Sequence, residues 1–123
     1  MALGPTCSVR FYIGAGVPGD VGRYKKLPVA FDDQTFRETV EAMVKKKFAN
    51  ATFFKTRGVW QGGSEDGYMV EVVMSPASGG CSAIFQRAEL LAKDIAFAFG
   101  QEAVLLIATD DTGRVEHGLI EAA

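Results

Sequence analysis

The chain of 123 residues has one histidine, one tryptophan and two cysteines. One histidine and two cysteines match no paired-ligand spacing, so a structural zinc site is not expected. An excess of basic charge is also lacking, because 13 basic residues stand against 15 acidic ones and the formal net charge is −2. A nucleic-acid footprint needs a basic face that neutralises phosphates, and this balance therefore argues against a nucleic-acid partner.

Long apolar runs are lacking too, since no stretch approaches the ~20 apolar residues that a membrane span requires. The segment from Met1 to Cys7 has neither the basic region nor the apolar run of a signal peptide. We therefore predict a soluble, cytoplasmic protein with no membrane partner. In that setting Cys7 and Cys81 are expected to be free thiols rather than a disulfide. An alternative for Cys81, just ahead of a predicted helix, is a reactive thiol stabilised by the helix dipole.

What the chain does contain is ordinary globular composition, with 48% hydrophobic and 23% charged residues. That composition excludes a disordered tail or a low-complexity linker. The length suits one domain with a real core, whereas two domains of half this size would each be marginal. We predict a single domain over residues 8–120 and an N-terminal extension over residues 1–7.

Alternation and helical spacing predict seven elements. Residues from Ser8 to Ile13 alternate between apolar and polar, which is typical of a strand buried on one face. After a glycine-rich loop over 14–28, apolar residues recur at helical spacing from an N-cap at Asp32 or Asp33 to an end near Phe48. The remaining predictions are strands over 51–57, 68–74, 103–108 and 114–120, turns over 61–67 and 110–113, and a helix from the N-cap Ser82 to a stop at Gly100.

This order of elements predicts an α+β fold of the ferredoxin-like α/β-plait type, β-α-β-β-α-β with one added C-terminal strand. Two strand–helix–strand units are split around a hairpin, and each crosses over right-handed to return to the same sheet. Both helices then cover one face of an antiparallel sheet, and the other face is left open.

The open face is predicted to be more apolar than a soluble monomer tolerates. Phe53 and Phe54 are adjacent, so one of them points away from the helices, and the strand over 103–108 is apolar on both sides. We expect a second copy or a ligand to cover this face, and we predict a homodimer or a higher homo-oligomer. The alternative is that the last strand and the N-terminal segment fold back over it.

Polar side chains on this apolar surface mark a candidate ligand site. Arg10, Tyr12 and Glu71 are predicted on the open face, and a few convergent polar groups in apolar surroundings are typical of small-molecule sites. The alternative for Arg10 and Glu71 is pairing across neighbouring strands. Trp60, flanked by glycines at a strand end, completes the predicted ligand-binding set as a lid or interface anchor, with closure of the core as its alternative. No catalytic residue, metal ligand or cofactor is predicted.

Other motifs carry weaker indications. The segment Gly14–Gly19 matches G-x-G-x-x-G after a strand, but no helix opens at the third glycine, so the dinucleotide fingerprint is incomplete. Arg23, Lys25 and Lys26 favour either a flexible anion-binding loop or a solvated basic loop. His117 lies in a late, peripheral strand, so we predict a surface residue rather than a general base.

Short motifs of the chain resemble a bacterial family of small α/β-plait proteins of uncharacterised function, and the likeness covers about residues 8 to 108. The motifs are Arg10–Gly14, Ala51–Phe54 followed by Gly58–Gly62, and Phe99–Leu105. The resemblance implies that Trp60, Gln101 and Glu102 hold the fold or line its cleft, and it implies no catalytic residue. A more distant likeness is to PII-type trimeric signal proteins, whose nucleotide motifs this chain lacks.

Three functional hypotheses follow. The first is a non-enzymatic homo-oligomer that binds a small apolar or anionic ligand on the open sheet face. The second is a cofactor-independent oxygenase or isomerase of the dimeric plait type, with Tyr12, Trp60 and His117 as candidate residues. The third is a protein-binding regulator or inhibitor that uses the same face for a different chain.

Overall fold

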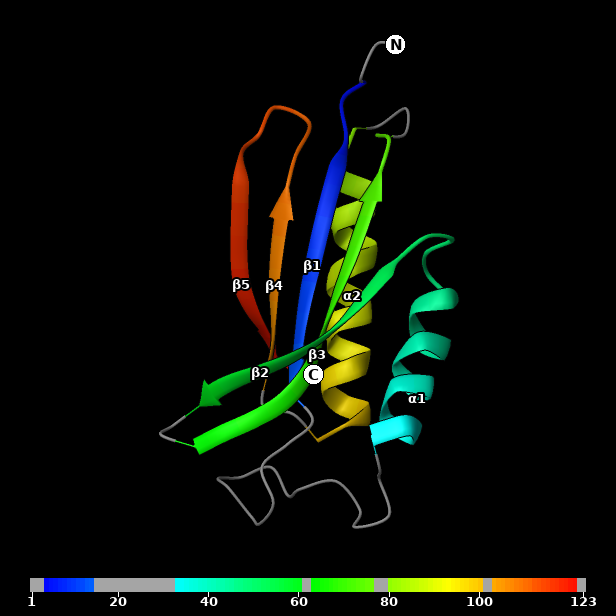
Figure 1. Cartoon of the computed structure of the whole chain (residues 1–123). Coiled ribbons are helices and arrows are strands. Elements are labelled where there is room, and N and C mark those ends of the chain that lie inside the picture. The colour runs from blue at the N-terminus through cyan, green and yellow to red at the C-terminus, as the bar shows by residue number, and fades with distance from the viewer. Residues whose placement is uncertain (1–3, 15–32, 61–62, 77–79, 101–102, 122–123) are drawn as a thin grey trace.

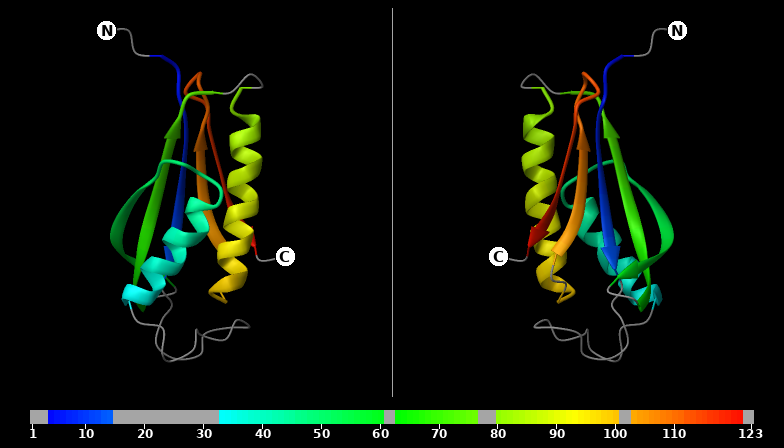
Figure 2. Two further views of the ribbon diagram at one scale, coloured as in Figure 1. Left: turned by 90° about the vertical axis from the view of Figure 1, so that its right-hand side faces the viewer. Right: turned by 90° about the vertical axis from the view of Figure 1, so that its left-hand side faces the viewer.

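The structure, a computed structural model, describes residues 4–14, 33–60, 63–76, 80–100 and 103–121. Five strands form one antiparallel sheet in the order β2-β3-β1-β4-β5, with β1 at its centre (Figure 1). Both helices lie on the same face of the sheet (Figure 2). This arrangement confirms the predicted α+β class. The elements are β1 (Cys7–Gly14), α1 (Asp33–Lys45), β2 (Thr52–Trp60), β3 (Gly63–Met74), α2 (Ser82–Ala98), β4 (Ala103–Thr109) and β5 (Val115–Glu121).

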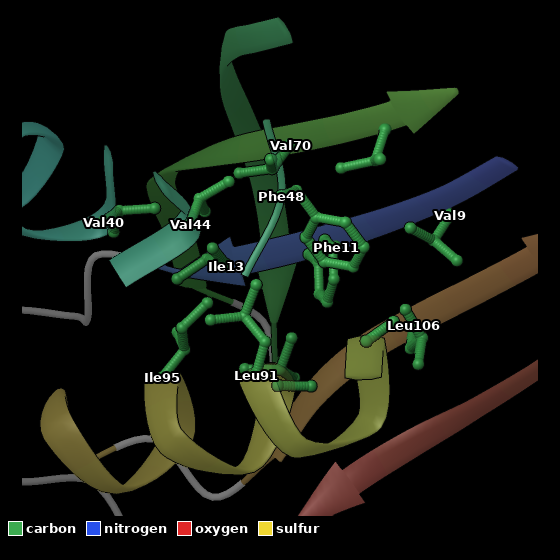
Figure 3. Close-up of a cluster of buried hydrophobic side chains, with 14 of the residues drawn as sticks. Val9, Phe11, Ile13, Val40, Val44, Phe48, Val70, Leu91, Ile95 and Leu106 are labelled. Carbon is green, nitrogen blue, oxygen red and sulfur yellow. The ribbon is translucent and has the colours of Figure 1, made fainter. Parts of the chain in front are cut away.

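The hydrophobic core fills the space between the sheet and the helices (Figure 3). Val9, Phe11 and Ile13 of β1 point into it, and Phe11 lies opposite Val70 of β3 and Leu106 of β4. Complete burial of such a side chain contributes about 1.5–3 kcal/mol relative to its exposure. A slip of one residue would turn these side chains to the other face, so their burial fixes the register of the central strands.

The helices complete the core with stripes at helical spacing. Phe36, Val40 and Val44 are the buried residues of α1. The ring of Phe36 lies 4.6 Å, centroid to centroid, from that of Phe99, which follows α2. Gly100 has a positive φ of 58°, which confirms it as the residue at which the helical conformation stops. The buried stripe of α2 consists of Ile84, Ala88, Leu91, Ala92, Ile95 and Ala96.

The prediction of a turn over 61–67 is wrong from residue 63 onward. β3 begins at Gly63, and its first five residues pair with the end of β2, from Trp60↔Gly63 to Thr56↔Gly67. Glycines and acidic residues disfavour strands locally, but the backbone ladder to a neighbouring strand outweighs that preference. Arg57 and Asp66, which face each other in this register, form an ion pair of 2.9 Å.

The prediction of free thiols is also wrong, because Cys7 and Cys81 form a disulfide. The first residue of β1 and the residue before α2 lie side by side, with 5.7 Å between their Cα atoms, although 74 positions separate them in the sequence. The bond also removes the reactive-thiol alternative for Cys81. The free thiols were predicted because disulfides persist in oxidising compartments and the protein was expected to be cytoplasmic. That inference is wrong for this pair. Cys81, not Ser82, occupies the N-cap of α2, and its side chain makes no capping hydrogen bond.

The hairpin between β4 and β5 turns at the predicted position. One carboxylate oxygen of Asp110 accepts hydrogen bonds from the hydroxyl and backbone N–H of Thr112 and from the backbone N–H of Arg114. These bonds hold the pKa of Asp110 below its ordinary value, and the two bonds from Thr112 have the largest effect. Their contribution to stability is therefore lost as the pH falls from the ordinary carboxyl pKa through the lowered one. Gly113 follows with a φ of 87°.

Neither described helix has the length and apolar character that a bilayer-spanning helix needs.

Reduction of the disulfide is expected to lower the free energy of unfolding by about 4 kcal/mol, because the bond restricts the unfolded chain over a long loop. Urea denaturation with and without a thiol reductant measures this difference. The variant with both Cys7→Ala and Cys81→Ala is the control, since the reductant should not change its midpoint. Equal midpoints for the wild-type protein in both conditions would contradict the prediction.

Gly67→Ala is expected to destabilise the protein by about 1–3 kcal/mol, as overpacking does. A Cβ at Gly67 would collide with the backbone carbonyl oxygen of Ile13 on the adjacent strand. Gly58→Ala is the matched control on β2, because a Cβ there meets nothing within 4 Å. Thermal denaturation of both variants tests this, and similar losses at the two positions would show that the collision is not the cause.

Candidate functional site

The open face of the sheet carries two cross-strand rows at its middle. The strand register aligns them from β2 to β5, so members of one row are neighbours on one face. The Arg10 row consists of Thr52, Glu71, Arg10, Ile107 and His117, and the Tyr12 row consists of Phe54, Met69, Tyr12, Leu105 and Leu119. A polar centre therefore lies directly beside a mostly apolar row.

Arg10 and Glu71 form an ion pair at the centre of the first row. The Nε atom of Arg10 donates a hydrogen bond of 2.8 Å to Oε2 of Glu71, and their side chains are 49% and 26% exposed. This bond and the charge of the Glu71 carboxylate raise the pKa of Arg10 above its ordinary value. The predicted alternative of pairing across neighbouring strands is thus confirmed. Arg10 keeps further N–H donors and Glu71 a second oxygen, so the pair retains capacity for a ligand.

Tyr12 follows on the same face, two residues after Arg10, and is half-buried. Its register partners are Met69 on β3 and Leu105 on β4, which are both half-buried as well. The phenol therefore presents one polar atom among apolar side chains, one row away from the ion pair. This juxtaposition of an aromatic ring, a cation and an anion is the main chemical feature of the open face.

Trp60 is not brought to this cluster. It is the last residue of β2 and pairs with Gly63, whereas the β2 residue in the Tyr12 row is Phe54, six positions earlier. At the usual rise per residue the separation along the strand is ~20 Å. The orientation of the Trp60 side chain lies outside the described residues, as do Gln101, Glu102 and the basic residues of the 15–32 segment.

His117 lies at the far end of the Arg10 row, on β5, with Ile107 between it and Arg10. Its side chain is exposed, which confirms the prediction of a surface histidine. Among the described residues no group of three or more histidine, cysteine, aspartate or glutamate side chains is arranged to hold a metal ion.

The structure also resolves which of the two adjacent phenylalanines faces outward. Phe54 lies on the open face and is 45% exposed, while Phe53 packs against the core. Phe54 and Thr52, at the β2 ends of the two rows, were not in the predicted ligand-binding set. Strand alternation indicates that one of the pair faces outward, but only the register with β3 places it beside Met69 and Tyr12.

Comparisons with known proteins give a fold likeness and no family. No protein-family model matches the sequence, and no curated protein matches it. A phage SAM lyase in the apo state is similar to this chain with a TM-score of 0.67 and 23% identity, over 99% of this chain and 94% of that chain. A phage SAM lyase in complex with S-methyl-5'-thioadenosine is similar with a TM-score of 0.63 and 22% identity, over the same shares. At these identities the likeness shows the fold alone.

The Arg10–Glu71 pair is expected to add less than about 1 kcal/mol to the free energy of unfolding, because solvent screens so exposed a pair. A double-mutant cycle with Arg10→Met and Glu71→Gln, followed by urea denaturation, measures the coupling. The exposed pair Arg57–Asp66 provides the reference cycle. A coupling energy well above that of the reference would assign the Arg10–Glu71 pair to stability and weaken the argument that it serves a ligand.

Proposed function

We propose that this chain is a lyase that acts on S-adenosylmethionine (SAM) and that the substrate binds on the open face at Arg10, Tyr12 and Glu71. The observation that carries the proposal is the likeness to phage SAM lyase, which extends over 99% of this chain and 94% of that chain. A likeness over nearly the whole of both chains supports the inference that they share a framework for a site.

We include in this proposal the finer description of the fold as a ferredoxin-like α/β plait. The strand order β2-β3-β1-β4 and the two strand–helix–strand connections support it, and β5 is then the additional strand at the β4 edge. In this arrangement β1 and β3 occupy the middle of the sheet. Arg10, Tyr12 and Glu71 are therefore held on the two central strands, where the packed inner face limits their movement.

The chemistry of the substrate suits the open face. SAM carries a sulfonium cation, an ammonium group, a carboxylate and an adenosine group. Formation of S-methyl-5'-thioadenosine breaks the bond from sulfur to the side-chain carbon of the amino-acid part, and the electron pair of that bond returns to sulfur. The substrate's own carboxylate oxygen forms the new bond to this carbon, so the second product is a lactone that keeps the amino group. The positive sulfur itself accepts the electrons, so this step requires no cofactor. Because a positive charge disappears at sulfur, apolar surroundings favour the step over water.

Each residue of the cluster has a counterpart on such a substrate. The Glu71 carboxylate attracts the sulfonium, and the ring of Tyr12 adds a cation–π contribution of about 0.5–1 kcal/mol. Arg10 offers N–H donors to the substrate carboxylate. Phe54, Met69 and Leu105 provide the apolar surface on which an adenine ring can pack. The cluster thus separates an anion-binding position from a cation-binding position on neighbouring strands.

The test is incubation of the purified protein with SAM and quantification of S-methyl-5'-thioadenosine by liquid chromatography and mass spectrometry. The wild-type protein is expected to form the thioether, and Glu71→Gln is expected to lower kcat/KM by about tenfold or more, or about 1.4 kcal/mol of transition-state stabilisation. Glu116→Gln, the same change at an exposed carboxylate on β5, is the control and should keep wild-type activity.

Two results would change the assignment. Binding of SAM or S-methyl-5'-thioadenosine without turnover would remove the lyase activity and favour the non-enzymatic ligand-binding hypothesis. Turnover that responds equally to Glu71→Gln and Glu116→Gln would keep the activity but move the site away from Glu71. The proposed function would be overturned if the protein showed no turnover of SAM and calorimetry detected no binding of either compound.

A further inference from the structure

We propose that the site also cleaves sulfonium amino acids other than SAM, such as S-inosylmethionine, which has hypoxanthine in place of adenine, and S-methylmethionine, which has no nucleoside. The inference rests on the proposed lyase function and adds the class of substrate that the site selects. It is carried by the division of the open face into the Arg10 row, which holds the ion pair, and the mostly apolar Tyr12 row beside it.

The reacting atoms all lie in the amino-acid half of the substrate. The bond that breaks joins the sulfonium sulfur to the side-chain carbon, and the carboxylate oxygen forms the new bond to that carbon. The nucleoside stays on the leaving sulfur. With S-methylmethionine the same bond breaks, its electron pair returns to sulfur, dimethyl sulfide leaves, and the same lactone with its ammonium group remains. The step needs no oxidant, reductant or second substrate.

The charged side chains of the site suit features that every sulfonium amino acid has. In the proposed binding mode Arg10 donates to the carboxylate and Glu71 attracts the sulfonium. The two side chains already contact each other at 2.8 Å, so they present both charges side by side. An analogue without one of these features leaves a charged group of the site unpaired, and such analogues are rejected strongly. Selection therefore acts on the amino-acid half.

The surface assigned to the nucleoside lacks such selectivity. In the Tyr12 row, Met69 and Leu105 are half-buried, and Phe54 and Leu119 are 45% and 58% exposed. The hydroxyl of Tyr12 is the only hydroxyl among these five described residues. Apolar surface binds flat or apolar groups according to the area they bury, and it discriminates between similar groups by about 10²-fold at most.

The row beyond Tyr12 adds one further hydroxyl. Thr56, Gly67 and Gly14 are aligned there on β2, β3 and β1, and Thr56 is half-buried. A hydroxyl both donates and accepts hydrogen bonds, so Thr56 and Tyr12 can bond to the amino group of adenine or to the oxo group of hypoxanthine. The side chains of these aligned residues therefore provide no group that distinguishes the two bases.

The test compares the three substrates through the lactone, which is their common product. Liquid chromatography and mass spectrometry quantify it, and a protein-free blank is subtracted from each rate. The kcat/KM for S-inosylmethionine is expected within about 10²-fold of that for SAM. The value for S-methylmethionine is expected to be lower than that for SAM, because the packing of the nucleoside is lost, but the rate should exceed the blank.

A matched pair of variants assigns the apolar surface to the nucleoside. Phe54→Ala is expected to lower kcat/KM for SAM by about tenfold or more and to leave S-methylmethionine unchanged, because that substrate has no ring to pack there. Phe97→Ala on α2, where the side chain is 77% exposed, is the control and should change neither value. Glu71→Gln should lower both. Circular dichroism checks that each variant is folded.

The outcomes separate this inference from the proposed function. If SAM is cleaved but S-inosylmethionine is slower by more than about 10²-fold, the base is recognised by hydrogen bonds and only the inference is overturned. Equal losses for SAM and S-methylmethionine in Phe54→Ala, or no cleavage of S-methylmethionine above the blank, would overturn it as well. No cleavage of SAM itself would remove the lyase activity and this inference together.

Discussion

Burial of one face of the sheet beneath two helices is the constraint on which the rest of this structure depends. Phe11 sits at the centre of that face, between Val70 and Leu106, and the register of three strands follows from their contact. Once the register is set, every second residue of β1 and β3 must point to the opposite face. The positions of Arg10, Tyr12 and Glu71 are therefore consequences of the core.

This dependence gives the candidate site its rigidity. A side chain held on a central strand, with packed neighbours one residue away on either side, moves less than a side chain on a loop. Because solvent screens the Arg10–Glu71 pair, we expect it to add little to stability. On that expectation the pair remains available to a ligand, as the proposed function requires.

Local features of the sequence were enough to predict the elements and the class of fold. Apolar alternation identified β1, and Gly100 marked the end of α2, because each signal lies within a few residues. Features that depend on distant partners were not predictable in this way. The Cys7–Cys81 bond joins elements 74 positions apart. The extension of β3 back to Gly63 depends on its ladder with β2, and the same ladder separates Trp60 from the Tyr12 row.

The disulfide also changes what an interruption of the backbone would do. Residues 8–80, which include α1, β2 and β3, lie inside the covalent loop that Cys7 and Cys81 close. A single protease cut anywhere in that stretch leaves two pieces that are still joined. The nicked molecule would keep its mass, apart from the water that the cut adds, and would separate into fragments only after reduction. Over residues 8–80 the chain is therefore held together by two covalent connections, the peptide backbone and the disulfide.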